Sequence, residues 1–162
     1  MAATPVGKRL LVLVHSRTGS TAALADAAVA GAREGGEPHV DVRLVDVADA
    51  GLDDVQGADA VLFATPARFG ALAGLTKDLL ERVYPWFEEV PDVRPGMPWT
   101  VIAKGASDPT GAVRDLERIL TGLRWRQVLP PLVVTGDATD DDLAAAAELG
   151  ATLAAGLDAR IW

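Results

Sequence analysis

Cysteine is absent from this chain of 162 residues, and this absence alone narrows the chemistry open to it. Disulfides, thiolate nucleophiles, cysteine-ligated zinc sites and iron–sulfur clusters all depend on cysteine. Aromatic residues are also scarce, at 5% of the chain, and there are two histidines. The function classes that need a reactive thiol or a thiolate-bound metal are therefore excluded.

The sequence has little that would suit a membrane or a nucleic acid. Its longest apolar runs are a handful of residues, and its beginning lacks the basic start, apolar stretch and cleavage site of a signal peptide. The formal net charge of −8 would repel phosphate backbones and anionic lipids. We expect a cytoplasmic protein with no membrane span and no nucleic-acid partner.

What is present is ordinary for a folded protein. Apolar residues make up 49% of the chain and charged residues 23%. A chain of this length buries roughly 70% of its unfolded surface, which is enough for a sizeable core. We therefore predict one domain that spans residues 1–162.

Apolar, β-branched segments alternate with helical patterns along the chain. The predicted strands are residues 9–14, 39–45, 60–64, 99–103 and 132–135, and the second alternates polar and apolar residues like an edge strand. Helices are predicted over residues 21–33, 72–84 and 140–159, and from residue 110 onward, with at most one short helix between the second and third strands. We expect Gly35-Gly36 to end the first helix and Pro85 the second.

This alternation predicts an α/β fold of three layers, α/β/α, around a five-stranded parallel sheet. Right-handed crossovers leave few arrangements of five parallel strands, and the order 2-1-3-4-5 is common at this size. In such sheets ligands bind beyond the carboxyl ends of the strands, here the first, third and fourth. The segments that follow these strands are therefore the candidate site.

The turn after the first strand has the composition of a phosphate site. Hydroxyl residues surround a glycine and lead directly into a helix, whose first N–H groups are unpaired and partly positive. A single hydroxyl would suffice if the turn only capped the helix. We predict that the phosphate of a ligand contacts Ser16, Arg17, Thr18, Gly19, Ser20 and Thr21.

Other families that bind or transfer phosphate groups require residues that this turn does not have. A P-loop needs a lysine in this turn, and a dinucleotide fingerprint needs three glycines where the turn has one. A receiver domain needs acidic residues where His15-Ser16 and Thr65 stand, and a low-molecular-weight phosphatase needs a cysteine. These families are therefore excluded, and we expect the turn to bind the phosphate group of another kind of ligand.

The segment after the third strand suits the edge of a flat polar ring. It combines a proline turn, an aromatic ring and a glycine, and its backbone groups can hydrogen-bond a ring while Phe69 or Arg68 covers a face. The alternative is an ordinary strand-to-helix turn with Phe69 in the core. The candidate ring-binding residues are Thr65, Pro66, Ala67, Arg68, Phe69 and Gly70.

Together these two segments resemble the flavodoxin family, and within it the NAD(P)H-dependent FMN reductases and WrbA-type quinone reductases. The resemblance rests on Ser16-x-Thr18-Gly19-x-Thr21 and on the segment from Asp59 to Gly70 with the helix after it. It runs in the correct order over most of the chain. It implies a flavodoxin-like fold in which residues 16–21 bind the FMN phosphate and residues 66–70 line the isoalloxazine ring.

The third loop departs from that pattern. Residues 104–111 lack the aromatic or threonine-rich composition of WrbA-type enzymes, and the chain lacks the insertions of the larger quinone reductases. We expect a more open pocket, with the flavin bordered by Lys104, Gly105, Ala106 and Ser107. The charge of Lys104 either favours the reduced, anionic ring or is simply solvated.

Three aromatic residues lie close together in the chain. Trp86 resembles a WrbA-type residue that reaches the flavin of a neighbouring subunit. The favoured interpretation is that Tyr84, Trp86 and Phe87 fill the core, which requires no such role. Such a cluster would also suit a contact between copies of the chain, so a homo-oligomer is one expectation. His15 is interpreted as structural.

The resemblance implies an FMN-dependent oxidoreductase that takes electrons from NAD(P)H and passes them to a quinone or another small acceptor. Flavin chemistry needs no acid–base group from the protein, and the sequence shows no convincing catalytic constellation, so no catalytic residue is predicted. Two alternatives stay open. One is an electron carrier that docks on a basic partner through its acidic surface, and the other is a binding or regulatory module that has lost the cofactor.

Overall fold

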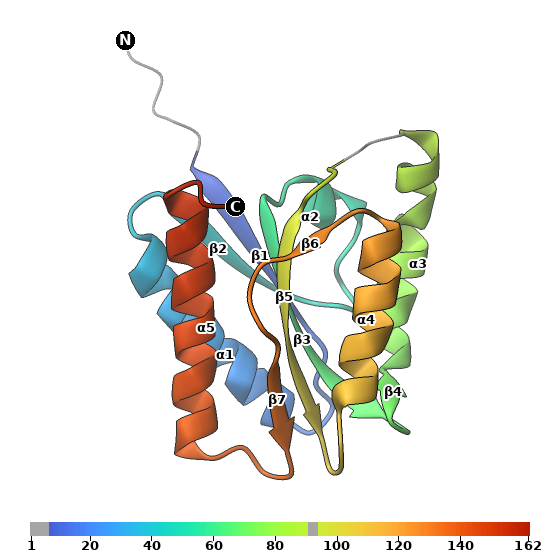
Figure 1. The fold of residues 1–162 in the computed structure, drawn as a ribbon, viewed down its shortest axis with the longest axis vertical. Helices are drawn as coiled ribbons and strands as arrows, with labels where there is room; N and C mark the ends of the chain where they lie inside the picture. The colour runs from blue at the N-terminus through green and yellow to red at the C-terminus, as the bar shows by residue number, and fades with distance from the viewer. Residues whose placement is uncertain (1–6, 91–93) are drawn as a thin grey trace.

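In the computed structural model, which describes residues 7–90 and 94–162, strands and helices alternate along the chain (Figure 1). The strands are β1 (Lys8–Val14), β2 (Val40–Asp46), β3 (Ala60–Arg68), β4 (Ala71–Leu72), β5 (Pro98–Gly105), β6 (Arg126–Gln127) and β7 (Leu132–Thr135). The helices are α1 (Ser20–Gly36), α2 (Leu52–Gln56), α3 (Gly74–Glu89), α4 (Thr110–Gly122) and α5 (Asp140–Asp158). The predicted α/β class is confirmed.

The main sheet has the order β2-β1-β3-β5, and the two short strands β6 and β7 both pair with β5 beyond it. All of these pairings are parallel. Because β7 takes the place of the fifth predicted strand, the expected order 2-1-3-4-5 is confirmed. The edge position of β2 also agrees with its alternating pattern.

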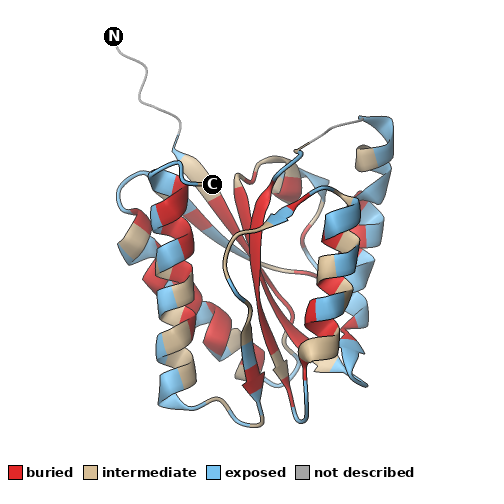
Figure 2. Cartoon of the chain, in the orientation of Figure 1, coloured by how far each residue is buried: buried red, intermediate tan, exposed pale blue. Residues whose placement is uncertain are grey.

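Helices cover both faces of the sheet, which gives the predicted three layers (Figure 1). α1 and α5 pack on one face, and the apolar residues of α2, α3 and α4 join the core on the other. The central strands are buried almost throughout, as Figure 2 shows. This double covering explains why β1 and β3 are continuous apolar runs.

α1 and α5 approach each other closely because glycines lie where they cross. A Cβ on Gly31 would overlap the carbonyl oxygen of Ala147, and a Cβ on Gly150 would overlap that of Ala28. The position of α1, whose first turn carries the hydroxyl residues, is therefore fixed by its contact with α5.

The third strand is longer than predicted. The sequence predicts a strand that ends at Ala64 and a loop over residues 65–70. In the structure β3 continues to Arg68, and the chain then turns back into β4. Both turn residues have positive φ, 52° at Phe69 and 71° at Gly70, which is the condition for a type I′ hairpin turn. Pro66 concealed the strand in the sequence, since proline is rare inside a sheet; here it lies in the last residue pair that β3 forms with β5.

The helix predicted over residues 72–84 is displaced. α3 begins at Gly74, because Leu72 belongs to β4, and it continues through Pro85 to Glu89, so the prediction that Pro85 ends it is wrong. In α3 the residue Leu75 is exposed, and the buried residues are Thr76, Leu79, Leu80 and Val83. The first helix likewise includes the glycine pair that was expected to end it.

The aromatic segment of α3 divides between core and surface. Trp86 and Phe87 are partly buried and pack against the core, whereas Tyr84 is exposed, so Tyr84 is not core filler. Residues 91–93 lie outside the described part of the chain, and β5 begins at Pro98, one residue before the strand predicted over residues 99–103. In the described ranges no helix is both long and apolar enough to cross a membrane.

Candidate functional site

The carboxyl ends of four strands meet at one edge of the sheet and enclose a pocket there. Register places Pro66 of β3 beside Lys104 of β5, and Gly105 beside Thr135 of β7. The cavity is about 300 Å³, at the small end of ligand pockets. It is lined by Thr18, Ser20, Pro66, Ala67, Arg68, Lys104, Gly105, Ala106, Gly136 and Asp137.

One end of the pocket is the turn between β1 and α1. Gly19 has a φ of 90° and donates its N–H to the hydroxyl of Ser16 over 3.1 Å, which closes the turn. The hydroxyls of Thr18 and Ser20 lie 3.4 Å apart and line the pocket, while Thr21 is buried. The hydroxyl groups of Thr18 and Ser20 therefore lie close together at the start of α1.

The first turn of α1 is prepared for an anion. It has no side-chain cap and no acidic residue. α5, which begins at the same edge of the sheet, is capped by Thr139 and carries three aspartates in its first turn. The α1 turn thus keeps its unpaired N–H groups and the positive end of its dipole for a negative ligand.

The hairpin formed by β3 and β4 makes a second wall of the pocket. Pro66, Ala67 and Arg68 line it, whereas the side chain of Phe69 is fully exposed at the tip of the hairpin. Thr65 is completely buried and its hydroxyl lies 2.8 Å from that of Thr76 on α3. This wall therefore presents mainly backbone groups to a ligand, together with the side chain of Arg68.

The third wall is the end of β5 and the loop after it. Gly105 accepts the N–H of Gly136 over 2.8 Å, and a Cβ at Gly105 would lie only 2.8 Å from the carbonyl oxygen of Ser107, which leaves no room for a side chain. Ala106 lines the pocket, and Ser107 is exposed outside it. Asp108 accepts hydrogen bonds from the backbone and hydroxyl of Thr110, which lower the pKa of its carboxyl and anchor the loop at the start of α4.

Two cations, Arg68 and Lys104, line the pocket of an otherwise acidic molecule, and a third, Arg17, precedes the lining residue Thr18 in the chain. Arg17 and Arg68 are exposed and Lys104 is half-buried, and none of the three forms an ion pair within the described residues. Asp137 is the one acidic residue in the pocket lining that the structure describes. The local charge therefore favours an anionic ligand.

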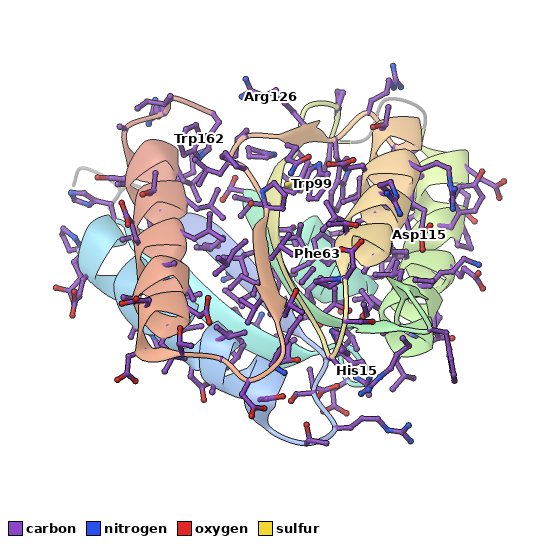
Figure 3. All side chains as sticks on the ribbon, turned by 60° about the horizontal axis from the view of Figure 1, so that its bottom comes forward. His15, Phe63, Trp99, Asp115, Arg126 and Trp162 are labelled. Atoms are coloured by element: carbon purple, nitrogen blue, oxygen red, sulfur yellow. The ribbon has the colours of Figure 1, made fainter. Side chains whose placement is uncertain are left out.

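His15 directly follows β1 and leads into the turn at residues 16–21 (Figure 3). It is buried, and this burial, with a smaller effect of the positive charges of Arg68 and Arg17, lowers its pKa, although Asp46 acts in the opposite direction. The imidazole is therefore neutral at pH 7, and it adds no positive charge to the site.

The structure brings the three predicted segments together, although their residues contribute unequally. The predicted residues that do not line the pocket are Ser16, Arg17, Gly19, Thr21, Thr65, Phe69, Gly70 and Ser107, which stand in the same three segments. Gly136 and Asp137 were missed. A glycine followed by an acidic residue directly after the fifth strand was the pattern that could have revealed them, had the end of that strand been counted as part of the site.

The arrangement can bind an anion at one end and a flat group between its other walls. In the described part of the chain no cluster of three or more histidine and carboxylate residues is placed to hold a metal ion. The pocket lining that the structure describes includes one carboxylate and no imidazole, so it contains neither a carboxylate pair nor a carboxylate–histidine pair.

Comparison with known families and proteins agrees with the observed fold. The sequence profile of the flavodoxin family matches residues 12–150, from the middle of β1 to well inside α5. The matched range includes every strand end that borders the pocket.

Two curated relatives share part of the chain. One is an NAD(P)H dehydrogenase (quinone) from Acidithiobacillus ferrooxidans, 33% identical over 92 residues, with 46% of this chain and 46% of the relative covered. The other, of the same name, is from Archaeoglobus fulgidus and is 30% identical over 95 residues, covering 45% of this chain and 50% of the relative. The chain thus matches about half the length of these relatives.

Among solved structures, a WrbA-like flavodoxin from Agrobacterium tumefaciens superimposes with a TM-score of 0.75 at 20% identity. The superposition covers 93% of this chain and 98% of that one. At this level of identity the likeness concerns the fold.

Proposed function

The chain belongs to the flavodoxin family, and from that premise we propose that it binds FMN in the pocket and acts as an NAD(P)H-dependent oxidoreductase. The observation that carries the proposal is the pocket itself, where an uncapped helix start lies at one end and two backbone-lined walls at the other. The names of the two curated relatives support the choice of a quinone as electron acceptor.

The turn at residues 16–21 fits a phosphate group. Thr18 and Ser20 would donate their hydroxyl protons to the phosphate oxygens, and the first N–H groups of α1 would complete the shell. The guanidinium of Arg17 adds positive charge nearby without a carboxylate partner in the described residues. The closed turn between Ser16 and Gly19 holds these donors in place before the ligand arrives.

The two other walls fit a flat heterocycle. Backbone groups from Ala67 to Gly70 would meet one edge of the isoalloxazine ring, and those from Gly105 to Ser107 another. The side chains at Ala67, Gly105 and Ala106 are small, which lets backbone approach the ring closely. Lys104, which lines the same pocket, would favour a reduced ring that carries negative charge.

Bound FMN would supply the redox chemistry, accepting a hydride from NAD(P)H and returning electrons to a quinone or another small acceptor. The protein would contribute binding, orientation and charge. The exposed Phe69 would cover part of the ring on the solvent side.

A spectroscopic experiment tests this proposal. The purified protein is loaded with FMN, its visible absorption is recorded, and NADH or NADPH is added without oxygen. We expect rapid bleaching of the flavin bands with at least one nucleotide, and recovery when a quinone is added. A flavin that stays oxidised with both nucleotides would reject the enzyme activity.

The second candidate is an electron carrier for a basic protein partner, and the net charge of −8 favours it. A carrier would bind FMN tightly without oxidising NAD(P)H. The same experiment separates the two functions, because a carrier is reduced only through its protein partner. A protein that cannot be loaded with FMN at all would instead support a module that has lost the cofactor.

The phosphate assignment has its own test. Replacing both hydroxyls in Thr18→Ala/Ser20→Ala should weaken FMN binding by a few kcal/mol, since each hydrogen bond to a charged group contributes roughly 1.5 to 3 kcal/mol. Thr121→Ala, at the far end of α4, is the matched control and should bind FMN like the wild type. Unchanged FMN affinity in the double variant would rule out this phosphate site.

A further inference from the structure

Helix α4 supports the hairpin that forms the ring-binding wall, although α4 itself contributes nothing to the pocket lining. Two of its residues contact the hairpin, and they are four positions apart, on the same face of the helix. Gly111 lies so close to the carbonyl oxygen of Gly70 that a Cβ would overlap it. Asp115, one turn later, accepts the backbone N–H of Leu72 over 2.9 Å (Figure 3).

The hairpin needs such support because it extends past the main sheet. The pairing of β3 with β5 ends at Pro66, and beyond it Ala67 and Arg68 pair only with β4. A ladder of two residue pairs is marginal by itself in water. The contacts with α4 and the buried hydroxyl pair of Thr65 and Thr76 therefore decide where the hairpin lies.

Asp115 is well suited to this task. Its side chain is 25% exposed, so the bond from Leu72 is only partly open to water. The Oδ2 atom accepts the N–H of Leu72 in the hairpin. Oδ1 accepts a hydrogen bond from the guanidinium of Arg118 over 3.0 Å, and this second bond keeps the carboxylate oriented. An ionised acceptor makes a stronger hydrogen bond to a backbone N–H than a neutral one.

We propose that Asp115 is a positioning residue for the ring half of the pocket, an inference that rests on the proposed FMN-binding function. It holds the hairpin at a fixed distance from the loop at residues 104–107, which leads into the same helix. The phosphate half of the pocket stands on α1 and is independent of Asp115. Loss of the carboxylate should therefore weaken contacts to the ring and leave contacts to the phosphate intact.

The closing experiment compares FMN with riboflavin, which has the ring but no phosphate. In Asp115→Ala we expect both affinities to fall by about tenfold, the order expected for one lost hydrogen bond to a charged group, so that their ratio stays as in the wild type. In Thr18→Ala/Ser20→Ala only FMN should bind more weakly. The unchanged ratio in Asp115→Ala and the changed ratio in Thr18→Ala/Ser20→Ala distinguish the ring half of the pocket from the phosphate half.

Three further variants complete the design. Asp115→Asn keeps an oxygen that can accept the Leu72 N–H and should restore most of the flavin affinity. Arg118→Ala removes the guanidinium that orients the carboxylate and should weaken binding of both flavins, by less than Asp115→Ala does. Glu117→Ala removes a neighbouring charge on α4 and is the matched control, which should bind both flavins like the wild type. Wild-type affinities in a folded Asp115→Ala, or an equal loss in Asp115→Asn, would overturn the proposal.

Hydrogen exchange supplies a measurement that needs no flavin. In the flavin-free protein we expect the amide of Leu72 to exchange faster in Asp115→Ala than in the wild type, while the amides of β5 keep their protection. If the wild type binds neither flavin, the FMN proposal fails. Exchange then still decides whether Asp115 holds the hairpin, because unchanged protection at Leu72 would overturn it.

Discussion

At the scale of single residues, the clearest departure from ordinary preference is Phe69. It has a φ of 52° and a fully exposed ring, whereas a type I′ turn favours asparagine or glycine at this position. A bulky residue in left-handed backbone costs of order 1 to 3 kcal/mol, and such residues are frequent at ligand sites. We propose that Phe69 is kept at this position because its ring covers the bound ligand.

Phe69→Asn should therefore raise the stability of the protein and lower its activity. We expect the free energy of unfolding in urea to rise by about 1 kcal/mol, because asparagine tolerates positive φ. Turnover of the FMN-loaded protein should fall, since the ring cover is lost. Arg160→Asn is the matched control: Arg160 is exposed with a φ of 56° after α5, so the change should leave turnover unaltered. A less stable Phe69→Asn would contradict this account of the turn.

His15 gives a prediction about pH. Burial lowers its pKa in the folded protein, whereas in the unfolded chain it takes up a proton near the ordinary pKa of about 6.5. Below that pH the unfolded state holds more protons, so the free energy of unfolding should fall as the pH decreases from 7. His15→Gln should lack this part of the pH dependence, and the exposed His39→Gln should retain it. Urea unfolding at a series of pH values measures both, and identical profiles for the wild type and His15→Gln would refute the prediction.

At the scale of secondary structure, sequence patterns located most elements and failed where proline stood inside one. β1, β7, α4 and α5 follow from apolar periodicity and lie close to their predicted bounds. Pro66 and Pro85 were interpreted as breaks, yet β3 and α3 continue through them, because tertiary packing outweighs the local preference. For the same reason the sequence did not predict the hairpin of β3 and β4 or its contact with α4.

The crossing of α1 and α5 also depends on contacts that no single segment reveals. Gly150→Ala would place a methyl group on the carbonyl of Ala28, and we expect the free energy of unfolding to fall by about 1 to 3 kcal/mol. Gly122→Ala, at the open end of α4, has no atom within 4 Å of the added group and should gain about 0.5 kcal/mol. Equal stability of the two variants in urea would show that the helices do not cross this closely.

At the scale of the whole molecule, the location of the pocket could be predicted and its full lining could not. Parallel strands with right-handed crossovers place Thr18, Pro66 and Lys104 at one edge, although they are far apart in sequence. Gly136 and Asp137 were not recognised, because their role depends on β7 lying beside β5. Which backbone groups face the pocket likewise follows only from the register of the strands.

The central claim is that this edge of the sheet binds FMN and uses the turn at residues 16–21 for the phosphate. Titration of the wild-type protein with FMN and with riboflavin tests it most directly. Since at least two hydrogen bonds from hydroxyl groups to a charged phosphate are at stake, FMN should bind about 100-fold more tightly than riboflavin or better. Equal affinities for the two flavins would contradict the account.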